Sequence, residues 1–198
     1  LWGNNIVTTL STNHAKAAGF SFKKSGDKPL KILIGAGISF LHSLNEFSKE
    51  LGKHGVECKV VLDRDYIGEF PSKELKGLFR TRKKFEKLIS TFKPDVVFID
   101  RMSKFGLEVI KSDIPLFLIV RGHYWLQNEW NEKTIYKNRL KQKLVEMRFK
   151  DDEQVFEGAT AILPLCNYLV EVVREHYPKQ NLHVFVEGID GSKWYTEK

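Results

Sequence analysis

The chain has 198 residues, of which 42% are hydrophobic, so it is long enough for one full core and one compact domain is the simplest expectation. It has no run of 18 apolar residues and no signal-peptide pattern, so we expect neither a transmembrane helix nor a secreted protein. The net charge of +7 raises nucleic acid, an anionic membrane or a phosphorylated ligand as partners, and charge alone does not choose among them.

Residues 1–29 are polar and do not share the pattern that follows. They are compatible with a linker, with an extra edge strand at 6–10, or with a disordered leader. We therefore place the start of the folded domain at residue 30.

From residue 30, short apolar runs alternate with helical patterns. The predicted strands are 30–35, 57–63, 94–100, 114–120, 160–165 and 182–187. The predicted helices are 39–55, a basic segment reaching residue 92, 105–113, the second half of the region up to 157, and 167–177. Apolar runs separated by helices are typical of a parallel sheet covered on both faces. We predict a doubly wound, Rossmann-like α/β domain over 30–187.

The first predicted helix carries an apolar face, and Gly55 is placed to end it as a C-terminal cap. The residues of that face are Phe40, Leu41, Leu44, Phe47 and Leu51.

Basic residues gather in segments 73–88 and 137–150, where apolar residues recur at helical spacing. We interpret both segments as amphipathic helices with solvated cationic faces. Contact with an anionic membrane surface is the next hypothesis, and no nucleic-acid partner is expected.

Cys58 and Cys166 lie far apart in apolar stretches, without the spacing of a metal site. We predict two reduced core residues in a cytoplasmic protein.

A ligand of such a sheet binds where the loops follow the strands. After the first strand, Gly35 and Gly37 would let the backbone approach a phosphate, and Ser39 begins the next helix. A tight strand-to-helix turn explains the same glycines equally well. Asp63, which ends the second strand, is placed like the ribose-binding acid of a dinucleotide site, whereas the bulk of Phe40 argues against that hypothesis.

The third strand is followed by Asp100, and the fourth by Arg121, Gly122, His123 and Tyr124. His123 is suited to proton exchange or to hydrogen bonding with sugar hydroxyls, and Arg121 to holding a phosphate. Tyr124 is either a stacking platform or the start of a core-facing helix.

The order and spacing of these segments resemble the N-terminal domain of GT-B glycosyltransferases, most closely the retaining family 4. The segments that carry the resemblance are "LKILIGAG", "LGKHGVECKVV", "KPDVVFID", "IPLFLIVRGHYW" and "HVFVEGIDGSKW". The last segment is similar to the family's Pro-Asn-Gly-Val-Asp-x-x-x-Phe signature, which leads into a second domain. Gly188, Asp190 and Trp194 fit that signature, and Val186 and Glu187 depart from it.

The resemblance implies half of an enzyme that transfers a sugar from a nucleotide-sugar donor, with retention, to a glycan, lipid or small-molecule acceptor. His123 would contact the transferred sugar, and the loop of Gly35 and Gly37 would approach the donor diphosphate. Residues 188–198, with Glu187, would start the crossing to a C-terminal Rossmann-like domain.

No metal or other cofactor is implied by the resemblance, and location on the inner face of a membrane is compatible with a lipid-linked acceptor. Two other hypotheses stay open. One is a stand-alone module that binds a nucleotide or dinucleotide for redox or regulation, and the other is a non-catalytic basic interaction domain.

Overall fold

The computed structural model describes residues 28–68, 82–136 and 139–185. The predictions for 1–27, including the edge strand at 6–10, fall outside these ranges. So do most of the basic segment 73–88 and the interdomain residues Glu187, Gly188 and Asp190.

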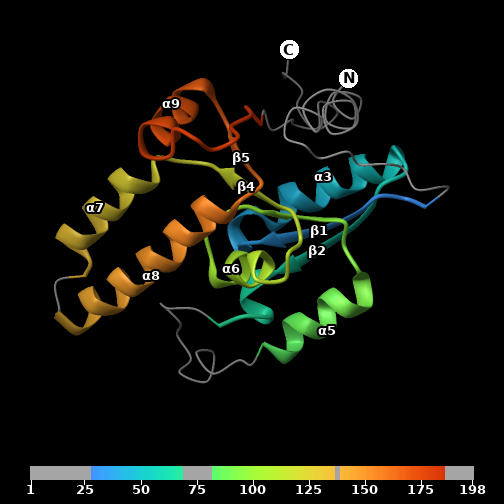
Figure 1. Cartoon of the computed structure of the whole chain (residues 1–198), viewed down its shortest axis with the longest axis horizontal. Helices are drawn as coiled ribbons and strands as arrows, with labels where there is room; N and C mark the ends of the chain where they lie inside the picture. Colours follow the sequence, from blue (N-terminus) through green and yellow to red (C-terminus); the bar gives the residue numbers. More distant parts are fainter. Residues whose placement is uncertain (1–27, 69–81, 137–138, 186–198) are drawn as a thin grey trace, which may run out of the picture.

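The described residues form an α/β fold whose elements follow the predicted order, except that a helix at Tyr124–Thr134 lies in the first half of the region up to 157, where only the second half was predicted to be helical (Figure 1). The strands are β1 (Lys31–Ala36), β2 (Glu57–Leu62), β3 (Val96–Ile99), β4 (Leu116–Val120) and β5 (Ala161–Pro164). The helices are α3 (Leu41–Lys53), α5 (Lys83–Phe92), α6 (Lys104–Ile110), α7 (Tyr124–Thr134), α8 (Arg139–Gly158) and α9 (Asn167–His176). Short 3₁₀ turns, η2 (Ile38–Phe40) and η3 (Asp63–Asp65), follow β1 and β2.

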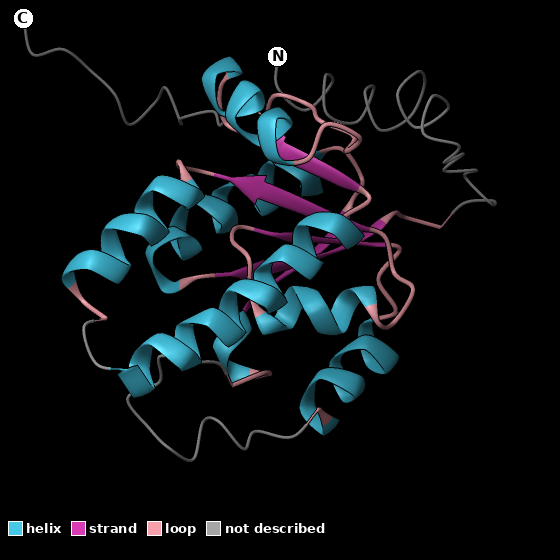
Figure 2. Ribbon diagram, turned by 60° about the vertical axis from the view of Figure 1, so that its left-hand side comes forward, coloured by secondary structure: helices cyan, strands magenta, loops and turns pink. Residues whose placement is uncertain are grey.

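All five strands are parallel and lie in the order β2-β1-β3-β4-β5. Figure 2 shows the strands of this sheet with the helices packed around them. The chain extends the sheet beyond β5, because Leu182 bridges Ile162 and the amide of Phe185 donates to the carbonyl of Pro164 at 2.8 Å. The sixth strand predicted at 182–187 is not a regular strand in the structure, but residues 181–185 pair with β5 in parallel through an isolated bridge and backbone hydrogen bonds.

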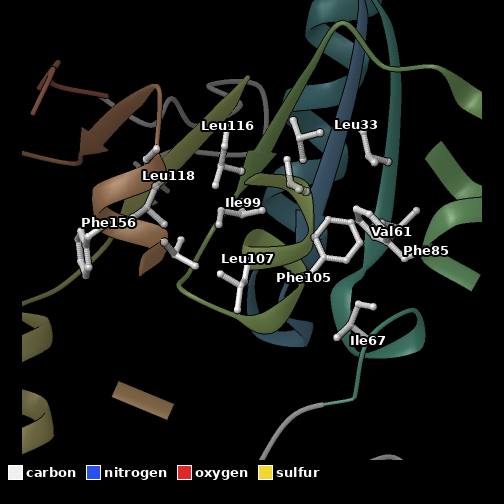
Figure 3. Close-up of a cluster of buried hydrophobic side chains, with 14 of the residues drawn as sticks. Leu33, Val61, Ile67, Phe85, Ile99, Phe105, Leu107, Leu116, Leu118 and Phe156 are labelled. Carbon is white, nitrogen blue, oxygen red and sulfur yellow. The ribbon is translucent and has the colours of Figure 1, made fainter. Parts of the chain in front are cut away.

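Apolar side chains leave the sheet on both faces and are covered by helices. Leu33 and Ile99 pack on one face with Phe105 of α6, in a cluster that also includes side chains of α5 and α8 (Figure 3). Ile34 and neighbouring side chains of the opposite face pack against Leu44 and Leu51 of α3. The doubly wound fold predicted from the sequence is thus confirmed.

The start of α3 differs from the prediction. The helix begins at Leu41 after the 3₁₀ turn, and Phe40 is 38% exposed instead of lying on the buried face with Leu44 and Leu51. A 3₁₀ turn has fewer residues per turn than an α-helix, so Phe40 points in another direction than the helical period predicts. At the other end, Gly55 has a φ of 78°, which confirms its place as the cap.

The two cysteines have different surroundings. Cys58 is half-buried, and burial raises the pKa of its thiol to about 11, so it stays protonated at neutral pH. Cys166 is exposed, and its prediction as a core residue is wrong because it lies between β5 and α9, where the chain leaves the sheet.

The packing of α6 against the sheet leaves no room for a side chain at Gly35. A Cβ at this position would lie 2.9 Å from Cε1 of Phe105, whose ring is buried against the sheet. The contact explains this glycine without an approaching phosphate.

We predict that Gly35→Ala lowers the free energy of unfolding by about 1 to 3 kcal/mol, because the added methyl group overpacks a filled core. Gly52→Ala is the matched control, since nothing lies within 4 Å of a Cβ there and Gly52 is in α3. Alanine should raise helix stability there by about 0.5 to 1 kcal/mol. Urea unfolding of both variants checks the prediction, and a Gly35→Ala protein as stable as wild type contradicts it.

Candidate functional site

The candidate site lies at the carboxyl edge of the sheet, where the strand order reverses. The chain proceeds from β1 to β2 on one side and reaches β3 on the other side of β1. In open parallel sheets, the ends of two such strands separate and leave a crevice in which ligands bind. Gly37 follows β1 at this point, and Asp100 and Arg101 follow β3.

Asp100 joins the ends of β1 and β3. Asp100 is 3% exposed as a residue, and its two carboxylate oxygens accept from the amide of Gly37 at 3.0 and 3.1 Å. Burial raises the pKa of the Asp100 carboxyl above its ordinary value of 3.8, against the Gly37 hydrogen bond and the positive charges of Arg101 and Arg121, which lower it. The sequence predicted that the backbone at Gly37 approaches a phosphate, but its amide donates to the Asp100 carboxylate instead.

Arg101 forms a second connection across the same edge. Its Nε and Nη2 donate to the buried carboxylate of Asp63 after β2, at 3.1 and 2.8 Å from Oδ2. The side chain passes over Gly37, where an added Cβ would lie 3.3 Å from Nε. Asp63, which was predicted as a possible ribose-binding acid of a dinucleotide site, is therefore paired with Arg101.

Arg121, after β4, lies over an exposed aromatic ring. Its guanidinium carbon is 4.1 Å from the centroid of Phe40, a cation–π distance. Phe40 therefore contributes to the site, a role that the predicted helical face did not reveal. The contact brings the loops after β1 and β4 together beside Asp100.

His123 is the N-cap of α7. Its Nδ1 accepts from the amide of Leu126 at 3.1 Å, which satisfies one of the free amides of the first helical turn. In the neutral ring, an accepting Nδ1 leaves the proton on Nε2. His123 can therefore offer a hydrogen-bond donor to a ligand while the helix cap fixes the ring.

Tyr168 in the first turn of α9 was not predicted. The residue is 63% exposed, and its ring centroid lies 6.3 Å from that of His123. An exposed aromatic face beside a hydrogen-bond donor can stack on a flat or apolar ligand face. The signal was present in the sequence, because Tyr168 follows the strand predicted at 160–165 and so lies at the same edge.

Three other predicted site residues have distinct surroundings. Ser39 is exposed in the turn after β1, and Gly122 is exposed with open space around it. Tyr124 is packed between helices, and its hydroxyl donates to Asp152 of α8 at 2.6 Å. Of the two alternatives for Tyr124, the structure supports the start of a core-facing helix.

No three His, Cys, Asp or Glu side chains come together as a metal centre within 28–68, 82–136 and 139–185. The groups described at this edge offer a ligand hydrogen bonding, guanidinium charge and aromatic surface.

No protein-family model matches the sequence, and no curated protein matches it either. Among solved structures, the chain is similar to UDP-N-acetylglucosamine 2-epimerase from Rickettsia bellii, with 12% identity and a TM-score of 0.48. The alignment covers 78% of this chain and 44% of the epimerase, so the chain spans less than half the length of that protein.

The raised pKa of Asp100 predicts a pH dependence of stability. A carboxyl whose pKa is higher in the folded state stabilises that state progressively as the pH falls through the raised pKa toward the unfolded value. Wild type should therefore gain stability relative to Asp100→Asn between pH 7 and 4, by at most about 1.4 kcal/mol per pH unit. Urea unfolding of both proteins across this range tests the sign, and a constant or opposite difference contradicts it.

Proposed function

We propose that this chain is the acceptor-side half of a glycosyltransferase that moves a sugar, with retention, from a nucleotide-sugar donor to a glycan, lipid or small-molecule acceptor. The observation that carries the proposal is the meeting of three predicted loops at the reversal of strand order. The hydrogen bond from Gly37 to Asp100 and the contact of Arg121 with Phe40 link these loops.

In the proposed mechanism, the diphosphate of the donor lies on the Arg121 side of the edge. The guanidinium supplies positive charge there, and its contact with Phe40 holds it in place. The Gly37 amide is less suited to this role than the sequence suggested, because Asp100 already accepts from it.

His123 is proposed to donate from Nε2 to a hydroxyl of the transferred sugar. The cap bond at Nδ1 selects this tautomer. Retention assisted by the leaving phosphate needs no carboxylate nucleophile. This agrees with the engagement of Asp100 by Gly37 and of Asp63 by Arg101.

A second Rossmann-like domain is proposed to provide most of the nucleotide contacts. The extension of the sheet through Phe185 runs parallel to β5, so this segment ends at the same edge as the candidate site. Residues 188–198, with Glu187, would lead from there to the second domain. The chain of 198 residues alone is expected to show no turnover, because only one wall of the cleft is present.

A lipid-linked acceptor would suit the basic surface of α8, where Arg139, Lys143 and Lys150 are exposed. We propose contact with the inner, anionic face of a membrane through such residues. Among the helices of the described ranges, none combines the length and the apolar character needed to cross a bilayer.

Two substitutions of His123 separate binding from folding. Asparagine is a good N-cap but lacks Nε2–H, so His123→Asn should keep stability within about 0.5 kcal/mol of wild type and weaken nucleotide-sugar binding about tenfold. His123→Ala should weaken binding and also lower the free energy of unfolding by about 1 kcal/mol, because alanine cannot cap the helix. His54→Ala is the control, because His54 is exposed and follows the C-terminal end of α3, away from the candidate site.

The measurement is a calorimetric titration of each protein with UDP-sugars, GDP-sugars and NAD, together with urea unfolding. Amide NMR shifts at Gly37, Arg121 and Gly122 should locate the nucleotide sugar at the predicted edge. Binding of NAD without binding of nucleotide sugars would contradict the transferase proposal and favour the dinucleotide module.

A further inference from the structure

Beyond its first turn, helix α7 is attached to the domain through few apolar contacts. Asn128 is its one buried residue, whereas Trp130 on its outer face is 60% exposed. An amphipathic helix normally buries an apolar stripe, so the place of α7 must depend on other contacts. Those contacts gather at its first turn, which His123 caps.

A buried polar cluster joins α7 to α8, which run side by side (Figure 1). Asp152 of α8 is 3% exposed and accepts from the hydroxyl of Tyr124 at 2.6 Å. Arg148, one turn earlier in α8, lies 3.5 Å from the same carboxylate oxygen and donates to Asn128. The buried Asn128 and the half-buried Tyr124 thus each have a partner on α8.

Trp125, which follows Tyr124 in the chain, has contacts of a different kind, with α9 as well as α8. The ring of Trp125 stacks on His176 of α9, with 3.7 Å between centroids, and also on Phe156 of α8 at 5.3 Å. Two consecutive residues are thus held by different partners, one by a directional hydrogen bond and one by stacking. Together they restrict rotation of the first turn about the helix axis.

The rotation of that turn sets the direction of the His123 ring, because His123 precedes Tyr124 and bonds to Leu126 within the same turn. We propose that Asp152 is a positioning residue that acts through Tyr124 to hold the His123 imidazole in its capped orientation. Its role in ligand binding rests on the proposed function, but its effect on the His123 ring does not.

The burial of Asp152 is unfavourable by itself, which argues for a role beyond packing. Burial raises the pKa of its carboxyl, while the Tyr124 hydrogen bond and the charge of Arg148 lower it. Replacing buried polar groups by well-packed apolar ones often stabilises a protein. The geometry assigns to this cluster the directional control that apolar packing lacks.

The test uses Tyr124→Phe, which removes the hydroxyl and keeps the ring. We expect hydrogen exchange at the Leu126 amide to become about tenfold faster, because the cap bond weakens. The imidazole nitrogen shifts of His123 should move toward a mixture of tautomers. Amides of β1 and β3 should keep their exchange rates.

Two variants in α8 complete the design. Asp152→Asn keeps an oxygen that can accept from Tyr124, so its effect should be smaller than that of Tyr124→Phe. Asp151→Asn is the matched control, because Asp151 is the adjacent acid and lies 3.9 Å from Lys104 instead of facing Tyr124. It should leave the Leu126 amide and the His123 shifts unchanged.

The positioning role is overturned if Tyr124→Phe leaves Leu126 and His123 unchanged, or if Asp151→Asn alters them equally. It is also overturned if exchange becomes faster throughout the sheet, since that outcome indicates general loosening. Titration with a UDP-sugar gives the second readout, and Tyr124→Phe should weaken binding about tenfold. If a saturating nucleotide sugar shifts none of the Gly37, Arg121 and Gly122 amides of wild type, the proposed donor contact of this half fails, while exchange at Leu126 still decides the positioning role.

Discussion

The hydrogen bond between the Gly37 amide and the Asp100 carboxylate is the contact on which the candidate site depends. It joins the ends of the two strands that an open parallel sheet tends to separate, at the point where its strand order reverses. A buried carboxylate is costly unless it is compensated, and here a backbone amide and two guanidinium groups offset part of the cost of burial. Because Gly37 is fixed, Arg101 can cross above it to reach Asp63.

Two kinds of packing therefore meet at the edge of the sheet. Beneath it, apolar side chains on both faces hold the strands without directional contacts. Above it, the positions of Arg101, Arg121 and His123 are set by an ion pair, a cation–π contact and a helix cap. Apolar packing fixes where the loops begin, and the polar contacts fix the directions of their side chains.

The sequence was sufficient for the fold because the strands are short, continuous apolar runs separated by helical patterns, although it did not predict α7 as a separate helix after β4. It located His123 and Arg121 correctly after β4, since position after a strand depends on chain order alone. It did not predict the bond of Asp100 to Gly37, because these residues are 63 positions apart and their pairing depends on strand order. The helical period also misplaced Phe40, because a 3₁₀ turn precedes α3 and shifts the phase of the helix.

The pairing of residues 181–185 with β5 limits how far the chain can be shortened from its C-terminal end. These residues cover the backbone of β5 on its outer side, and Phe185 packs edge-on against Phe47 of α3, with 5.6 Å between centroids. A shorter chain that ended before Asn181 would leave β5 as an open edge strand and remove an aromatic ring from the core. Such a protein would be prone to associate through β5, so expression boundaries should lie beyond Phe185.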